Sequence, residues 1–452
     1  MSTAGPPTIL SPAPDRLLGR VSGPRPGPTL VVVGGLHGNE PAGLEAADRV
    51  LASMRSGDAL ERGTFVALRG HIEALWASHL DPRADFRYID RDLNRSFVDD
   101  VAGGADPGAV EWRERDELRA ALDEIDRESD GPCALIDLHT VSSPSPPFVA
   151  VEDSIAARRL AMRLGLPLIL GMEEELDGLL IDDVTRRLGW IGAIVESGQH
   201  DDPRSVDVHE AVIRLALDAM GMSPADARAR EVVGEAAGRV ARHVYDVRFR
   251  AEVGDASFRT HDAAAAFMRV RAHETVVATE SGREIIAQES GRLFMPNRQR
   301  TPRVGDDAYF VVRRVGRSWL SLSSWLRRRP WLHAAVPSLL PGVRRRPGHP
   351  GDLLVSPDVS AVLRRQILHL LGYRLVRFTA QPGVPLWRRV LAGTGVLAHA
   401  VGMIVLGAFR GGERAALPEE TERDWIVRRR VLDLEPRLLD ERPASDQAAA
   451  IE

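Results

Sequence analysis

Lysine is absent from this sequence, and cysteine, aromatic residues and net charge are all scarce. The basic residues, 59 in total, are all arginine; with abundant alanine, glycine and proline, this indicates a GC-rich coding sequence rather than a functional signal. The single cysteine, Cys133, excludes an internal disulfide and fits a reducing compartment. A formal net charge of −5 argues against a global basic field, so we expect no nucleic-acid partner.

The sequence also lacks the apolar core of a secretory signal peptide within residues 1–20, so we expect a cytoplasmic protein. At 452 residues, with 44% hydrophobic and 27% charged residues, the chain is too long for one ordinary core. Changes in composition predict an α/β domain over residues 1–225, to which the motifs described below assign catalysis, and a small β-rich domain over 226–316. Residues 317–452 form a C-terminal extension, and their composition does not indicate its role.

Short apolar runs alternate with amphipathic stretches between about residues 29 and 217. The runs "TLVVVGG", "CALIDLH" and "IGAIVESG" are typical of buried strands, and "AGLEAADRVLASM" and "EWRERDELRAALDEIDRES" have helical spacing. This alternation predicts an α/β fold with a mostly parallel sheet flanked by helices, which binds ligands at the carboxyl ends of its strands. His37, His139 and Glu196 lie at or just beyond the ends of these runs, which indicates a common site.

The turn "GGLHGNE" presents His37 and Glu40 three residues apart, so that one turn offers two metal ligands. Zinc catalysis needs a third protein ligand and an open position, and His139 in "DLHT" supplies the third. Asp137, two residues earlier on the same strand face, is predicted to orient an imidazole. Glu196 in "VESG" is then the carboxylate that deprotonates water. Each residue alone is more often a solvated or hydrogen-bonded side chain, but their coincidence at strand ends favours a metal site.

The segment "RYIDRDLNRSF", residues 87–97, concentrates arginines and an asparagine in one loop. The planar guanidinium group binds carboxylates through two parallel hydrogen bonds, and an adjacent amide adds direction. Beside a candidate zinc site, we interpret this loop as a dock for a small anionic substrate. The alternative is a solvated loop whose arginines pair with Asp90 and Asp92.

In this order and spacing, the four motifs resemble the succinylglutamate desuccinylase/aspartoacylase family, a branch of the zinc carboxypeptidase clan. The resemblance covers about residues 29–200, and a weaker one continues in "GRLFMPNRQRTPRVGD", which is similar to the end of the family's β-rich second domain. It implies a zinc-carboxypeptidase-like fold with one zinc ion per chain, held by His37, Glu40 and His139. Glu196 then matches the family's general base and acid.

The resemblance also implies the substrate, an N-acyl amino acid or similar small carboxylate-bearing amide that is cleaved at its amide bond. Arg87 matches the arginine that polarises the scissile carbonyl, and Asn94 and Arg95 match the pair that holds the substrate's carboxylate. Arg186 falls where aspartoacylases keep an arginine for a second substrate carboxylate. His71 and His79 lie where the family often has an Asn-Pro turn, and we expect them to be structural or at the surface.

Two alternatives use the same motifs. A zinc carboxypeptidase acting on peptides would combine this metal site with a more open groove. A non-catalytic or membrane-associated binding protein that retains the fold would lack a ligand or the base, and none is missing here. Residues 390–409, "VLAGTGVLAHAVGMIVLGAF", are long enough to span a bilayer. However, their glycines and His399 favour packing inside protein, so membrane association is the less favoured interpretation.

Overall fold

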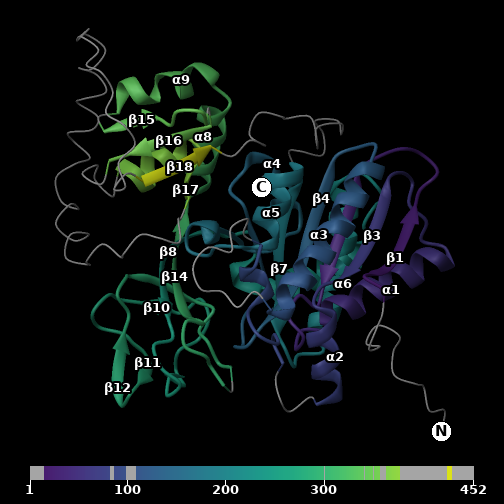
Figure 1. Ribbon diagram of the computed structural model, residues 1–452, viewed down its shortest axis with the longest axis horizontal. Helices are drawn as coiled ribbons and strands as arrows, with labels where there is room; N and C mark the ends of the chain where they lie inside the picture. The colour runs from purple at the N-terminus through teal and green to yellow at the C-terminus, as the bar shows by residue number, and fades with distance from the viewer. Residues whose placement is uncertain are drawn as a thin grey trace. The chain divides into compact units, whose positions relative to one another are not determined.

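Figure 1 shows the computed structural model of the chain, which forms two compact units. One unit comprises Met1–Glu152, Ala156–Val315 and Glu435–Glu452, and the other comprises Asp153–Ile155 and Gly316–Leu434. The structure describes residues 15–81, 86–97, 108–299, 301–340, 342–349, 351–356, 363–376 and 425–429.

The first unit is built on a large sheet, which within the described residues has eleven strands in the order β1-β3-β2-β4-β7-β5-β6-β8-β14-β13-β10. The central strands β3, β2, β4 and β7 run parallel, whereas β1 and β5 run antiparallel to β3 and β7. The strands of the α/β part are β1 (Leu17–Ser22), β2 (Thr29–Gly34), β3 (Thr64–Arg69), β4 (Cys133–Val141), β5 (Phe148–Val151), β6 (Leu168–Leu170) and β7 (Ile191–Gln199).

Helices cover both faces of this sheet, as its apolar strands require (Figure 1). Every residue of β2 and β4 is buried, which is typical of parallel strands with both faces covered. Helices α1 and α6 contact each other and β2, while α3 and α5 share a core cluster with Val31 and Val33. The predicted α/β fold with a mostly parallel sheet is therefore confirmed. The helices are α1 (Ala42–Ser56), α2 (Ile72–Leu80), α3 (Val110–Glu128), α4 (Ile155–Arg163), α5 (Leu180–Leu188), α6 (Arg204–Ala219) and α7 (Ala227–Ala237), with short 3-10 turns at Leu93–Arg95, Met172–Glu174 and Gly238–Val240.

The β-rich segment is divided between two sheets: β8, β14, β13 and β10 continue the large sheet, and a separate three-stranded sheet has the order β12-β11-β9. Strand β8 (Val244–Glu252) pairs in parallel with β6 and antiparallel with β14 (Asp307–Val315). The hairpin β11–β12 turns at Ser281 and Gly282, whose φ values of 49° and 71° suit a tight turn of the type that joins antiparallel strands. The other strands are β9 (Arg259–Thr260), β10 (Arg269–Val270), β11 (Val276–Glu280), β12 (Arg283–Ile286) and β13 (Gly291–Phe294).

The second unit has its own small core around a sheet in the order β15-β16-β18-β17. Within it, buried Arg327 and Arg374 both bind the Asp153 carboxylate, Arg327 at 2.8 Å. No helix in the described part of the chain combines the length and the apolar content needed to cross a membrane. Residues 390–409 lie outside the described residues. The elements of this unit are α8 (Arg317–Arg327), α9 (Pro330–Leu339), β15 (Val343–Arg345), β16 (Asp352–Val355), a π-helix (Leu363–Leu368), β17 (Tyr373–Val376) and β18 (Trp425–Arg429).

Candidate active site

The turn after β2 carries two of the predicted ligands, and glycine is required to build it. Gly35 has a φ of +68°, a conformation that other residues adopt rarely. A Cβ atom on Gly38 would lie 2.2 Å from the carbonyl oxygen of Ala74, so no side chain fits there. The backbone N–H of Glu40 donates to the carbonyl of His37 at 3.1 Å, which closes the turn. Both side chains are therefore held at the carboxyl end of β2, and both are buried.

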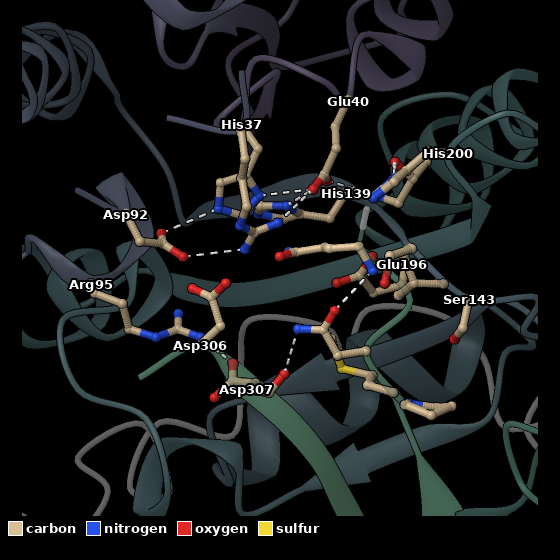
Figure 2. A pocket seen from close by; sticks show the side chains of 18 of the residues that line it. His37, Glu40, Asp92, Arg95, His139, Ser143, Glu196, His200, Asp306 and Asp307 are labelled. Atoms are coloured by element: carbon tan, nitrogen blue, oxygen red, sulfur yellow. Dashed lines mark hydrogen bonds and ion pairs between the residues drawn. The ribbon is translucent and has the colours of Figure 1, made fainter. Parts of the chain in front are cut away.

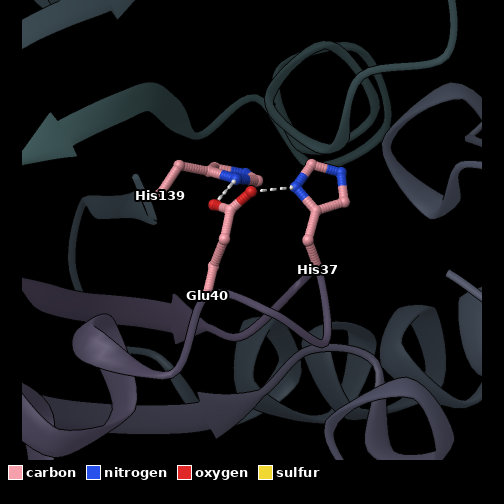
Figure 3. Close-up of side chains that lie close together, drawn as sticks. All are labelled: His37, Glu40 and His139. Carbon is pink, nitrogen blue, oxygen red and sulfur yellow. Dashed lines mark hydrogen bonds and ion pairs between the residues drawn. The ribbon is translucent and has the colours of Figure 1, made fainter. Parts of the chain in front are cut away.

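His139 joins them from β4, the neighbouring parallel strand. One ligand atom from each of His37, Glu40 and His139 lies within 4.8 Å of the others. Figure 3 shows the two imidazoles on either side of the carboxylate. Nδ1 of His37 lies 2.9 Å from one Glu40 oxygen, and Nδ1 of His139 lies 3.0 Å from the other. The three residues predicted as metal ligands thus meet at one point.

Each imidazole turns its second nitrogen toward another carboxylate. Nε2 of His139 lies 2.8 Å from Asp137, the residue predicted to orient an imidazole, and Nε2 of His37 lies 3.2 Å from Asp92. A carboxylate at Nε2 favours the tautomer that leaves Nδ1 free to bind a metal. Because two imidazole Nδ1 atoms and a carboxylate form a typical zinc donor set, the residues present fit a zinc ion.

The electrostatics of the cluster also suit a cation. Burial alone would raise the pKa of Glu40, but the His37 and His139 imidazoles lower it well below its usual range. Burial would likewise raise the pKa of Asp92, and His37 and Arg87 lower it well below its usual range. Both carboxylates are therefore ionised at neutral pH. Burial alone would lower the pKa of His139, but Asp137 and Glu40 raise it well above its usual range, so the metal-free cluster holds positive charge on this imidazole that a bound cation would replace.

Glu196 faces the cluster from β7. In the pairing of β4 with β7, it lies directly beside His139. Its side chain is buried, and its Oε2 atom has no hydrogen-bond partner. Burial raises the pKa of Glu196 to about 8, and positive charge bound beside it would lower that pKa. The site thus contains a carboxylate that is not used in binding the protein's own groups.

The arginine motif reaches the same site, but its members lie in different places. Arg87 lies 3.0 Å from Glu40 and 3.2 Å from Asp92, and lines the pocket with them. Arg95 also lines the pocket and binds Asp307 at 2.7 Å (Figure 2). Arg87 and Arg95 are therefore not in a solvated loop, and they bind different carboxylates of the pocket.

Asn94 and Arg186, both predicted to hold substrate carboxylates, do not line this pocket. The Asn94 amide oxygen accepts the backbone N–H of Leu180 at 2.9 Å, and its nitrogen lies 3.3 Å from Nε2 of His139. Asn94 thus connects the start of α5 to a candidate ligand. The Arg186 side chain, on α5, is 42% exposed and lies 3.8 Å from Asp183. The structure does not bring Arg186 to the pocket.

The pocket has a volume of about 170 Å³, and several of its residues were not predicted from the sequence. Asp92 was considered only as a partner in a solvated loop. Thr140 and His200 also line the pocket, and the Thr140 hydroxyl lies 2.7 Å from Nδ1 of His200. Both residues lie close in sequence to predicted site residues, His139 in "DLHT" and Glu196 in "VESGQH", so this proximity could have indicated them. The far wall carries Arg250, Asp306 and Asp307 from the β-rich segment, where only the weak similarity around "PRVGD" pointed to a function.

Two other buried histidines lie outside the pocket. His71 caps α2 and lies 3.0 Å from Glu111, as expected of a structural residue. Burial alone would lower its pKa, but hydrogen bonds to Glu111 and Glu114 raise it. His209 on α6 is fully buried without a hydrogen-bond partner for either nitrogen, and burial lowers its pKa to about 3. His209 is therefore neutral.

Comparison with known proteins finds similarity over the α/β part of the chain. Residues 26–218 match the model of the succinylglutamate desuccinylase/aspartoacylase catalytic domain. An N-acyl-aromatic-L-amino acid amidohydrolase (carboxylate-forming) of Xenopus tropicalis is 28% identical over 204 residues, which cover 44% of this chain and 58% of that protein. This chain thus spans less than two thirds of the length of that relative.

Solved structures give weaker matches. A succinylglutamate desuccinylase/aspartoacylase from Rhodobacter sphaeroides has 18% identity and a TM-score of 0.48, covering 66% of this chain and 88% of its own. A succinylglutamate desuccinylase from Vibrio parahaemolyticus has 17% identity and a TM-score of 0.46, covering 65% and 82%. The match to the succinylglutamate desuccinylase/aspartoacylase catalytic-domain model covers residues 26–218, the segment that carries all four motifs.

Proposed function

We propose that this protein is a zinc-dependent hydrolase that cleaves the amide bond of an N-acyl amino acid or a similar small carboxylate-bearing amide. The observation that carries the proposal is Glu196, a buried carboxylate whose Oε2 has no partner, beside the cluster of His37, Glu40 and His139. The family match supports a hydrolase, and the Xenopus relative is named for the same type of reaction.

His37, Glu40 and His139 would hold the zinc ion through two Nδ1 atoms and a carboxylate. When bound, zinc supplies Lewis acidity, which makes water a stronger acid and polarises a carbonyl oxygen. The chain's own residues supply the proton transfer. Glu196 Oε2 takes a proton from the attacking water and delivers it to the amide nitrogen, so that a C–O bond forms as the C–N bond breaks.

Arg87 and Arg95 position the substrate and stabilise its charge. The Arg87 guanidinium, held beside Glu40 and Asp92, stabilises the negative charge that develops on the acyl oxygen. Arg95 at the opposite part of the pocket contacts the substrate's carboxylate in exchange for part of its contact with Asp307. Asn94 contributes through His139 and α5 rather than by touching the substrate.

A panel of N-acetyl and N-succinyl amino acids, with small peptides as the competing substrate class, tests the proposal. Zinc-loaded protein should release free amino acids from members of the first group, and Arg95→Ala should raise KM by roughly 10-fold or more with a smaller change in kcat. Hydrolysis of peptides alone would favour the carboxypeptidase alternative. No hydrolysis in either group by protein with full zinc content would contradict the proposal.

A further inference from the structure

The arginines that line the pocket are already bonded to carboxylates of the protein. Arg87 contacts Glu40 and Asp92, at 3.0 and 3.2 Å. Arg95 and Arg250 both contact Asp307, at 2.7 and 2.5 Å. Arg95 and Arg250 share the Asp307 carboxylate, and Arg250 also contacts Glu252 outside the pocket, so each guanidinium already has an ion-pair partner with which a second anionic group would compete.

Asp306 differs from the other carboxylates of the pocket. It ends the turn before β14, where its Oδ2 accepts the backbone N–H of Arg303 at 2.8 Å. Within the described residues, its Oδ1 accepts no hydrogen bond and no cationic side chain forms an ion pair with it. Figure 2 shows its carboxylate pointing into the pocket, on the side opposite Glu196 and near Arg95 and Asp92. Asp306 is thus a half-buried carboxylate that faces the substrate's space with one oxygen, Oδ1, that accepts no hydrogen bond from the described residues.

On the basis of the proposed function, we propose that Asp306 selects N-acyl amino acids whose side chain carries a cationic group, an ammonium or a guanidinium. With Glu196 and the metal ligands fixing the scissile amide, and Arg95 the carboxylate, the remaining side chain of the substrate extends toward the far wall that Asp306 forms. A cation there gains a charge-assisted hydrogen bond to Oδ1. A carboxylate on the substrate's side chain would instead be repelled by Asp306 and Asp307. Arg186, which was predicted to bind such a group, does not line the pocket.

The apolar part of the lining supports the same choice. Val141, Met295 and Pro296 line the pocket, and no phenylalanine, tyrosine or tryptophan of the described residues does so. An aromatic side chain of a substrate would therefore have no ring to pack against, whereas the methylene groups of a basic side chain fit beside these residues.

Two pairs of isosteric substrates isolate the charge. Nα-acetyl-L-ornithine differs from Nα-acetyl-L-norleucine by an ammonium in place of a methyl group, and Nα-acetyl-L-arginine differs from Nα-acetyl-L-citrulline by its charge. We expect kcat/KM of the zinc-loaded protein to be roughly 10- to 100-fold higher for the cationic member of at least one pair, because hydrogen bonds to charged groups have energies of this order. Nα-acetyl-L-glutamate should be poorer than either neutral compound.

Asp306→Asn tests the residue itself. The amide oxygen of asparagine still accepts the Arg303 N–H, so the turn is kept while the charge is removed. The variant should lose the 10- to 100-fold preference, measured as the ratio of kcat/KM between the cationic and the neutral member of the same pair. Asp262→Asn, at an exposed turn outside the pocket, makes the same change in net charge and should keep the preference.

Calorimetric binding of the free amino acids L-ornithine and L-norleucine provides a readout that needs no hydrolysis. Tighter binding of ornithine that Asp306→Asn abolishes would support the role of Asp306 even if no amide were cleaved, a result that contradicts the proposed function alone. Hydrolysis of neutral or dicarboxylic substrates with equal preference in wild type and Asp306→Asn would overturn the inference and leave the proposed function standing. Absence of both hydrolysis and binding would overturn both.

Discussion

Glu196→Gln should change how the stability of the metal-free protein depends on pH. In the folded protein burial raises the pKa of Glu196 from 4.5 to about 8, whereas in the unfolded chain it ionises near 4.5. Between these values the folded state holds one proton more than the unfolded state, so this residue makes the free energy of unfolding fall as pH rises. At about 1.4 kcal/mol per pH unit, the full effect across the window is about 4–5 kcal/mol.

Glutamine is neutral at every pH and has nearly the same shape, so the variant lacks this dependence. Unfolding by denaturant in the presence of a chelator, at several values between pH 5 and 8.5, should therefore show the variant gaining stability relative to wild type as pH rises. Added zinc should reduce the difference, because positive charge beside Glu196 favours its ionised form. Glu235→Gln, at an exposed position on α7, is the matched control and should show no trend. A constant difference between Glu196→Gln and wild type across this range would refute the assignment of a raised pKa. The same variant should keep zinc and lose turnover, and near wild-type kcat would remove Glu196 as the base.

Three further outcomes follow from the site. Protein purified without added metal should contain about one zinc per chain by elemental analysis, and His37→Ala or His139→Ala should lose it; full zinc occupancy in either variant would exclude that residue as a ligand. Asp137→Asn should weaken zinc binding roughly 10- to 100-fold in a competition assay with a chelator, because the carboxylate at Nε2 of His139 orients the ring; unchanged affinity would show that the 2.8 Å contact has no such effect. His71→Ala should destabilise the protein by about 1–3 kcal/mol, since it removes one buried partner of Glu111 and Glu114, while Glu114 keeps its ion pair with Arg16 and Glu111 keeps its backbone hydrogen bonds. His79→Ala, on the partly exposed end of α2, should change the midpoint of unfolding little, and equal effects of the two substitutions would contradict this reasoning.

The sequence by itself determined the α/β fold and the place where the candidate metal ligands meet. The apolar runs before His37 and His139 are typical of buried central strands, and parallel strands bring their carboxyl ends to one edge. Residues at those ends meet whatever the details of packing, which is why His37, Glu40, His139 and Glu196 lie together. The periodicity of two along β4 likewise placed Asp137 on the face of His139.

The tertiary structure alone decided which charged residues reach the substrate's space. Adjacent residues of a helix point about 100° apart, so the doublet Arg186–Arg187 in the sequence did not indicate which side chain faces where. In the structure Arg187 binds Asp183 and Asp123, whereas Arg186 is 42% exposed and only approaches Asp183, at 3.8 Å. The choice depends on how α5 packs, which no local pattern encodes.

The charged residues of the far wall of the pocket were even harder to predict from local sequence. Arg250 and Asp307 are 57 residues apart, and only the pairing of β8 with β14 brings their charges together. Arg95 reaches Asp307 across 212 residues of sequence. Such ion pairs depend on how distant strands pair. The sequence motif by itself predicts that Arg95 binds the substrate, but it does not show that Asp307 also binds Arg95. Local sequence patterns therefore predicted the candidate metal ligands. The charged residues of the opposite wall, including Asp306, come from the β-rich segment, and only the tertiary structure places them in the pocket.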